Sequence, residues 1–204
     1  MVKNRFIECM RLEKEFYLGN DVLVIARNLI GKVLFTKINN KVTAGIITET
    51  EAYNGIIDKA SHAYGNRRTK RTETMYKEGG VSYIYLCYGI HSLFNVVTNV
   101  EHVPHAILIR AIVPYAGAAT MLQRRNATVL KNALFNGPGK VCQALGIDYS
   151  FDGIALSGKK IWIEDKSISI NKNQISATPR IGVDYAGEDA LLPYRFLLKD
   201  TSNL

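Results

Sequence analysis

The chain has 204 residues, 47% of them hydrophobic, which is enough to bury a core and to form one domain over residues 1–204. Its apolar runs are too short to cross a bilayer, and residues 1–5 lead into charged side chains rather than a secretory signal. The net charge of +8 and the pI of about 9.4 predict a polyanionic partner. These features therefore argue against a membrane-spanning or exported protein. We expect the protein to work in the cytoplasm, associated with the nucleoid, if it is bacterial, and in the nucleus if it is eukaryotic.

The cysteines and histidines give no sign of a cross-link or a metal site. Cys9, Cys87 and Cys142 are widely spaced and odd in number, which indicates reduced thiols rather than a disulfide framework. His102 and His105 flank a Val-Pro turn and are more simply a fortuitous pair than metal ligands. The residues therefore predict no metal site.

The positive charge is unevenly distributed along the chain. No acidic residue lies between Glu101 and Asp148, whereas residues 148–204 carry eight acidic and seven basic side chains. The densest basic cluster comprises Arg67, Arg68, Lys70 and Arg71. It indicates a loop that contacts phosphates, although a solvated charge run or a nuclear-import signal would have the same composition.

The first predicted elements are a helix and a hairpin. Asp21 can cap a helix over residues 22–30, and Gly31 can end it. β-Branched and aromatic residues then predict strands over 32–38 and 41–53. The Asn-Asn link between them tolerates the positive φ of a two-residue hairpin.

The remaining elements predict a sheet covered by helices. Residues 54–80 are polar and basic, which indicates a long ordered surface loop. Strands are predicted over 81–89, 94–99 and 106–113, with a turn at 88–93 and Pro114 as the last stop. Helices follow over 116–126, 128–136 and 139–146, and short strands over 160–164 and 195–199. Because hairpins connect the strands, the predicted fold class is α+β with a mostly antiparallel sheet.

The strand over 41–53 ends on acidic and aromatic groups. Glu49, Glu51 and Tyr53 share one face because strand side chains alternate, so a carboxylate and a ring project into one space. In the strand over 106–113 Arg110 interrupts a buried run, and a buried guanidinium needs an acceptor, for which Glu51 is a candidate. A strand-end glutamate is more often solvated, so this pattern by itself leaves both interpretations open.

Aromatic and glycine-rich motifs follow. Tyr83 and Tyr85 share one strand face and Tyr88 stands at the tip, so these rings are either core residues or stacking platforms. Residues 137–139, Gly-Pro-Gly, precede a helix. Their backbone donors, with Lys140 beside them, either receive a phosphate or only start the helix.

Seven pieces of sequence stand in one order between about residue 14 and residue 199, and together they are highly specific. They are Glu49-Thr50-Glu51-Ala52-Tyr53, His62, Tyr83-x-Tyr85-x-x-Tyr88-Gly89, Asn95, Leu108-Ile109-Arg110-Ala111 with Pro114, Gly137-Pro138-x-Lys140-x-Cys142-Gln143-Ala144-Leu145 and Arg180-Ile181-Gly182-Val183. In these pieces the chain closely resembles the alkyladenine (3-methyladenine/methylpurine) DNA glycosylase family. The resemblance implies a compact domain with a curved sheet, a protruding β-hairpin that enters the DNA minor groove, and excision of alkylated purines without metal or cofactor.

The resemblance also implies a role for each matching residue. Glu51 is expected to be the general base that activates water, and Arg110 with the backbone of Ala52 and Tyr53 to help hold that water. A second group acts on the base: Tyr53, His62 and Tyr85 are expected to line its pocket, Asn95 to exclude the guanine 2-amino group, and Tyr88 to fill the gap in the duplex.

These roles agree with the energetics of base extrusion. Flipping a nucleotide costs a few kcal/mol, and stacking on aromatic rings returns roughly 1–3 kcal/mol per base. Cation–π attraction favours alkylated, cationic purines, and a neutral base such as hypoxanthine is expected to react more slowly. No lysine is singled out as a nucleophile. We therefore expect a monofunctional, monomeric enzyme that acts on double-stranded DNA with alkylated or deaminated purines and leaves an abasic site.

Residues 77–80 and 91–94 depart from the family pattern, which leaves the range of lesions, including ethenoadenine and hypoxanthine, open. Two other functions compete with the glycosylase. One is a non-catalytic module that stacks single-stranded bases on sheet tyrosines. The other is a metal-dependent phosphodiesterase with the ligands Glu49, Glu51, Asp58 and His62.

Overall fold

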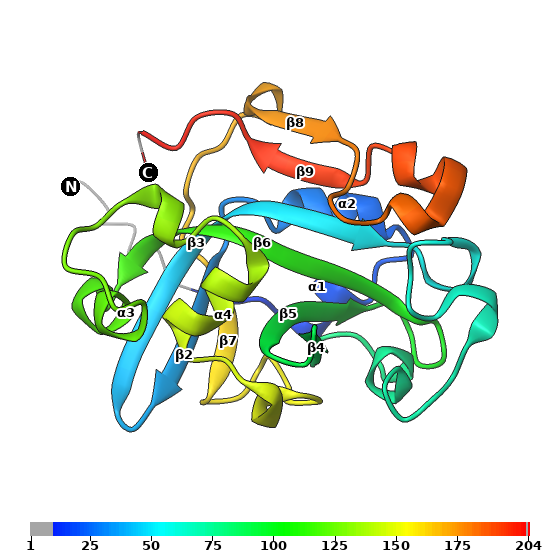
Figure 1. The fold of residues 1–204 in the computed structure, drawn as a ribbon, viewed down its shortest axis with the longest axis horizontal. Helices are drawn as coiled ribbons and strands as arrows, with labels where there is room; N and C mark the ends of the chain where they lie inside the picture. Colours follow the sequence, from blue (N-terminus) through cyan, green and yellow to red (C-terminus); the bar gives the residue numbers. More distant parts are fainter. Residues whose placement is uncertain (1–9, 203) are drawn as a thin grey trace, which may run out of the picture.

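The sheet is organised around its two longest strands, β3 (Lys41–Tyr53) and β6 (His105–Ala116), which pair with each other (Figure 1). The structure is a computed structural model that describes residues 10–202 and 204. The other strands are β1 (Met10–Arg11), β2 (Val33–Ile38), β4 (Ser82–Cys87), β5 (His91–Thr98), β7 (Ile161–Asp165), β8 (Ile175–Thr178) and β9 (Arg195–Leu198). Every pairing among the described strands is antiparallel, which confirms the predicted α+β class.

Two strands share one edge of β3. The strand order is β1-β7-β2-β3-β6-β5-β4, and β9 pairs with β3 and β8. β2 pairs with β3 over residues 41–46, whereas β9 pairs with residues 49–51 farther along the same edge. This arrangement brings the segment before β9 to the end of β3 that carries Glu51.

The helices flank the sheet. In the described part of the chain they are α1 (Lys14–Tyr17), α2 (Val22–Asn28), α3 (Ala118–Arg124) and α4 (Pro138–Leu145). As predicted, α2 begins behind Asp21, whose side chain accepts hydrogen bonds from two backbone amides at 2.8 and 3.2 Å. α2 packs on one face of β3, where the Thr50 hydroxyl donates to the Ala26 carbonyl at 2.9 Å. Because strand side chains alternate, Glu51 projects from the opposite face.

The long loop predicted over residues 54–80, all of which are described, is confirmed, and its regular structure consists of short 3₁₀ turns. These turns are η1 (Gly55–Ile57), η2 (Tyr64–Asn66) and η3 (Glu73–Tyr76). The others are η4 (Asn132–Leu134), η5 (Tyr149–Phe151), η6 (Lys172–Gln174) and η7 (Asp184–Leu191). Figure 1 shows the loop beside the β4–β5 hairpin at one end of the sheet.

Two predicted boundaries are wrong. The β4–β5 turn is shorter than 88–93, because β5 begins at His91 and positive φ values at Tyr88 (52°) and Gly89 (73°) close a tight turn. β6 does not end at Pro114 but continues to Ala116. Pro114 lies opposite Gly45 at a register shift, so its missing N–H interrupts no regular ladder.

The predicted helix over 128–136 is also wrong, since only η4 forms there. Asn126 adopts a positive φ of 49° just after α3, and the β-branched Thr128 and Val129 then favour extended backbone. β1 and β8 were not predicted, because two and four residues are too few to show a strand pattern. The Asn39–Asn40 turn is confirmed, with φ of 49° and 61°.

Cys87 and Cys142 are free thiols, as predicted, whereas Cys9 and residues 1–5 lie outside the described residues. Within residues 10–202 and 204 no helix combines the length and the apolar character needed to cross a membrane.

Gly79, just before β4, tests how tightly this end of the sheet is packed. A Cβ atom there would lie 2.7 Å from the Tyr17 carbonyl oxygen and 3.0 Å from that of Asn99, both backbone atoms. Gly79→Ala is therefore expected to lower the free energy of unfolding by about 1–3 kcal/mol in urea denaturation. Gly19→Ala, whose Cβ would be 3.4 Å from the flexible end of Ile25, is the control and should stay within about 0.5 kcal/mol of wild type. Equal losses in both variants would contradict this account.

Candidate active site

The centre of the site is the carboxylate of Glu51, which has no exposed surface. Its Oε1 accepts a hydrogen bond from the Ile181 amide at 2.8 Å. Its Oε2 accepts one from the Tyr53 hydroxyl at 2.9 Å and one from Arg110 Nη1 at 3.3 Å. The predicted pairing of Arg110 with Glu51 is confirmed, and β3, β6 and the segment before β9 each supply one part of the cluster.

Arg110 links this carboxylate to a second one. Its Nε donates to Glu49 Oε1 at 3.0 Å, and Arg195 Nη1 donates to the same oxygen at 3.0 Å. Glu49 and Glu51 therefore lie on the same face of β3, as the alternation predicts. Each buried acid has a cationic partner, which offsets the cost of removing it from water.

Burial nevertheless dominates the titration of Glu51. Loss of solvent raises its pKa above the ordinary value, while the charge of Arg110 and the hydrogen bonds from the Ile181 amide and the Tyr53 hydroxyl act in the opposite direction. A carboxylate with a raised pKa is a stronger base than an exposed one, which suits general-base chemistry near neutral pH.

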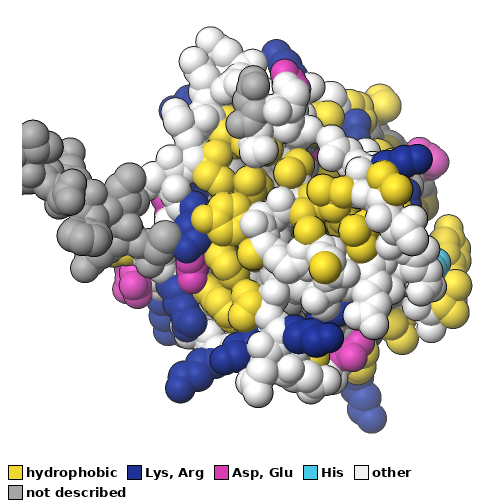
Figure 2. All heavy atoms as spheres, turned by 90° about the vertical axis from the view of Figure 1, so that its left-hand side faces the viewer, with side chains coloured by type: hydrophobic (Ala, Val, Ile, Leu, Met, Phe, Trp, Pro, Cys, Tyr) yellow, Lys and Arg dark blue, Asp and Glu magenta, His cyan; other side chains and the backbone are white. Residues whose placement is uncertain are grey.

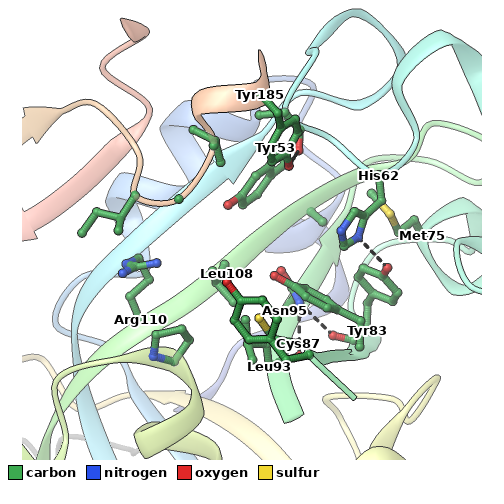
Figure 3. Close-up of a pocket in the computed structure, with 18 residues that line it drawn as sticks. Tyr53, His62, Met75, Tyr83, Cys87, Leu93, Asn95, Leu108, Arg110 and Tyr185 are labelled. Carbon is green, nitrogen blue, oxygen red and sulfur yellow. Dashed lines mark hydrogen bonds between the residues drawn. The ribbon is translucent and has the colours of Figure 1, made fainter. Parts of the chain in front are cut away.

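A cavity of about 220 Å³ opens in front of this cluster (Figure 3). This is smaller than the roughly 300–1,000 Å³ of drug-sized pockets, so it suits a single ring system. Its lining comprises Tyr53, Ala60, His62, Met75, Tyr83, Tyr85, Cys87, Tyr88, Leu93, Asn95, Ala106, Leu108, Arg110, Pro138, Ile181, Gly182, Val183 and Tyr185. Glu51 lies behind this wall, since its three partners Tyr53, Arg110 and Ile181 all line the cavity.

Aromatic rings form two sides of the cavity. In the view of Figure 3, Tyr53 and Tyr185 project toward the cavity from one side, and His62 and Tyr83 lie on another side. The rings of His62 and Tyr85 meet edge to face with centroids 4.6 Å apart, and Tyr83 and Tyr85 lie 5.9 Å apart. A flat group that enters the cavity therefore meets ring surfaces on two sides.

His62 is a neutral group in this wall. Its Nε2 lies 3.3 Å from Arg71 Nη2, and because a guanidinium can only donate, Nε2 must accept. The ring proton is therefore on Nδ1, which donates to the Tyr83 hydroxyl at 2.9 Å. Burial and the charges of Arg71 and Arg67 lower the pKa of His62 to about 4.

Asn95 and Ala52 differ in position. Asn95 is buried in the cavity wall, and its side-chain amide nitrogen donates to the carbonyls of Tyr83 and Leu93, at 3.1 and 3.3 Å. Because the nitrogen is already used in these bonds, the side-chain oxygen is the atom that Asn95 can offer to a ligand. Ala52 does not line the cavity: its side chain belongs to the core, and its amide donates to the Tyr194 carbonyl at 2.8 Å. The structure therefore does not bring the Ala52 backbone to the predicted water site.

The hairpin tip carries Tyr88 at the rim of the cavity. This ring is 91% exposed, and the neighbouring Ile90 is 73% exposed. Two large apolar side chains exposed to solvent on one tight turn form an apolar projection that a binding partner can cover.

The basic residues of the loop are not equivalent. Arg68 forms an ion pair with Glu73 at 2.6 Å, whereas Arg71 packs over the Tyr85 ring, 5.5 Å from its centroid. Arg67 and Lys70 are exposed. Figure 2, in which the left-hand side of Figure 1 faces the viewer, shows further Lys and Arg side chains, so positive charge is not confined to this loop.

The Gly-Pro-Gly segment starts a helix, because α4 begins at Pro138. Lys140 is exposed there, and its Nζ donates to the Ala133 carbonyl at 2.9 Å. Pro138 itself lines the cavity.

Sequence reasoning missed the contribution of the segment 181–185. Ile181, Gly182, Val183 and Tyr185 all line the cavity, although the sequence pattern assigned them no role. The signal that could have found them is the Arg180-Ile181-Gly182-Val183 piece, to which the sequence pattern gave no role and in which Gly182 adopts a positive φ of 73°.

The proposed metal ligands are engaged elsewhere. Asp58 pairs with Arg180, Glu49 with Arg110 and Arg195, and His62 with Tyr83. Among residues 10–202 and 204 no three His, Cys, Asp or Glu side chains gather as a metal site would require. The geometry gives the phosphodiesterase alternative no support.

Comparisons with known proteins converge on one family. The family model described as methylpurine-DNA glycosylase matches residues 15–202. A relative from Chlamydia felis, named "Putative 3-methyladenine DNA glycosylase", is 52% identical over 188 residues, which cover 92% of this chain and 95% of the relative. Relatives of the same name from Desulfitobacterium hafniense and Clostridium perfringens are 44% and 43% identical, over 94% of this chain and 96% and 97% of their own lengths.

The lowered pKa of His62 predicts a loss of stability in mild acid. Below about pH 6.5 the unfolded chain binds a proton at this histidine and the native chain does not, so stability falls until the native group titrates near pH 4. Between about pH 7.5 and pH 5 the free energy of unfolding is therefore expected to fall in both proteins, and to fall by about 1–2 kcal/mol less in His62→Gln than in wild type. Urea denaturation at both pH values measures the difference. The exposed His91→Gln is the control, and an identical pH dependence in all three proteins would refute the assignment.

Proposed function

Because the chain belongs to the methylpurine-DNA glycosylase family, we propose that it excises alkylated purines such as 3-methyladenine and 7-methylguanine from double-stranded DNA. It acts as a monomer of one domain, hydrolyses the N-glycosidic bond and leaves an abasic site. The bacterial origin of the relatives named above suggests that it works on the DNA of the nucleoid. The observation that carries the proposal is the buried Glu51 carboxylate directly behind a small aromatic cavity.

Base extrusion explains the rings. Moving a damaged nucleotide out of the base stack costs a few kcal/mol. Stacking of the base on Tyr53 and against His62 and Tyr85 offsets this cost by roughly 1–3 kcal/mol per base. Tyr88, at the cavity rim on the exposed hairpin, enters the duplex and fills the space that the base leaves. Asn95 at the cavity wall disfavours bases that carry a 2-amino group, so 7-methylguanine is released more slowly than 3-methyladenine.

The chemistry needs one activated water. The Glu51 carboxylate has no exposed surface and lies behind Tyr53, Arg110 and Ile181, so the water that it activates must reach it between these groups. Glu51 takes a proton from this water as its oxygen attacks the anomeric carbon, and the alkylated purine leaves with the bonding electrons. A neutral purine leaves less readily, because no acid is positioned to protonate it.

The DNA backbone is held by the basic side chains. We assign phosphate contacts to Arg67, Arg68, Lys70, Arg71 and Lys140. Arg67 and Lys70 contribute most of the salt-dependent affinity, because Glu73 already neutralises Arg68 and Arg71 is packed on Tyr85. Lys140 adds a contact beside the cavity, on the first turn of α4.

Purine release tests the proposed function directly. Wild-type protein incubated with methylated duplex DNA and a chelator is expected to release free purine and an equal amount of abasic sites. Glu51→Gln should release purine about 10²–10⁴-fold more slowly, the range that a general base contributes, while it still binds lesion duplex. Glu15→Gln, on the exposed surface of α1, is the control and should retain wild-type activity. Binding without release by wild type would favour the single-stranded-binding module instead.

Insertion of the hairpin tip predicts a dependence on strandedness. Tyr88→Ala is expected to weaken capture of a lesion in duplex DNA about tenfold or more and to change binding of the same lesion in a single strand little, because only a duplex leaves a gap to fill. Fluorescence anisotropy with both forms of one oligonucleotide measures this ratio. Tyr115→Ala, a half-exposed tyrosine on β6, is the matched control. Equal losses on both forms would show that Tyr88 does not insert.

A further inference from the structure

A second buried ion pair lies outside the cavity, between Asp58 and Arg180. The side chains are 1% and 0% exposed, and Arg180 Nη1 and Nη2 each donate to a different oxygen of the Asp58 carboxylate. The guanidinium packs on two rings, 5.0 Å from the centroid of Tyr53 and 5.2 Å from that of Tyr194. Neither charged residue lines the cavity, so neither is placed to touch a bound base.

The pair joins three segments that form the cavity wall. Arg180 donates to the Ala52 carbonyl at the end of β3, at 2.9 Å, and to the carbonyl of Asp189 in η7, at 3.1 Å. Asp58 accepts from the backbone amides of Asn54 and Ala60, each at 3.0 Å, in the loop after β3. One guanidinium thereby fixes the strand end, the following loop and the C-terminal segment relative to one another.

The same pair adjoins two of the groups that contact Glu51. Ile181 follows Arg180 in the chain, and its amide donates to Glu51 Oε1 at 2.8 Å. The ring of Tyr53, which packs against Arg180, carries the hydroxyl that donates to Glu51 Oε2. A small shift of Arg180 therefore moves both donors.

We propose that Asp58 and Arg180 form a positioning unit for base excision, which holds the Tyr53 ring and the Ile181 amide in place around Glu51. This inference rests on the proposed function for its catalytic consequence. A buried ion pair is a costly way to add stability, since apolar residues of similar volume often serve as well or better. Its planar, bidentate geometry instead fixes orientation, and a misplacement of about 1 Å can cost about 10²-fold in rate.

Two conservative variants test the proposal. Asp58→Asn keeps the shape and removes the charge, and Arg180→Lys keeps the charge and removes the fork. Each is expected to slow single-turnover purine release about 10–100-fold in protein that remains folded. Lys32→Gln removes an ion pair with Asp165 elsewhere in the sheet and is expected to leave the rate unchanged. Wild-type rates in both Asp58 and Arg180 variants would overturn the proposal.

A titration of Glu51 separates positioning from a loss of structure. Its neighbours are Arg110, Tyr53, the Ile181 amide and Glu49, and Arg180, Tyr85 and Tyr185 also interact with it electrostatically. The titration therefore uses Arg180→Lys, which keeps both charges of the pair. If this variant displaces the Tyr53 and Ile181 donors while the carboxylate stays buried, the Glu51 pKa rises further, whereas a site that loosens and admits water brings the pKa down toward the ordinary value. Carbon-13 NMR of the Glu51 carboxyl in free protein distinguishes the two, and we expect the rise. A fall, or no change, would overturn the proposal.

The two readouts also separate this inference from the proposed function. If wild type releases no purine, the proposed function fails, and the titration still decides whether the pair holds the donors on Glu51. If neither ion-pair variant folds, Tyr194→Leu removes one ring beside Arg180 and leaves both charges in place. It is expected to shift the Glu51 pKa in the same direction by a smaller amount, and an unchanged pKa would overturn the proposal.

Discussion

The structure depends on keeping one carboxylate charged and out of water. Glu51 is completely buried, and an isolated carboxylate in that position would take up a proton rather than remain a base. Arg110, the Ile181 amide and the Tyr53 hydroxyl compensate the lost solvent in part, and burial still raises the pKa of Glu51. Each comes from a different part of the chain, so the site exists only when the strands that carry them are in register.

The topology of the sheet follows from this requirement. β6 runs the length of β3 and places Arg110 beside Glu51, while β2 leaves the second half of the other edge of β3 free. β9 pairs there and brings the segment 180–185 to the carboxylate. The C-terminal part of the chain is therefore part of the site, although about 130 residues separate Ile181 from Glu51.

The parts of the fold and of the site that depend on neighbouring residues could be predicted from sequence. The Asp21 cap, the Asn39–Asn40 turn and the alternation of Glu49 and Glu51 each depend on neighbouring residues only, and all were confirmed. The helix over 128–136 failed because its pattern ignored the backbone turn that ends α3. Ile181, Tyr185 and the Asp58–Arg180 pair could not be found in this way, because their partners lie far away in the chain.

The cations packed on the tyrosine rings of the cavity affect its selectivity for damaged bases. Free tyrosine rings attract a cationic purine, as the sequence suggested, but Arg180 packs on Tyr53 and Arg71 packs on Tyr85, and neither guanidinium lines the cavity. Each ring already interacts with a permanent cation, which reduces the gain from a second one. Stacking area then governs binding, and it is similar for damaged and undamaged purines. In the proposed mechanism, discrimination falls to the bond that breaks: an alkylated purine leaves without an acid, whereas an intact purine needs a proton that neutral His62 does not supply.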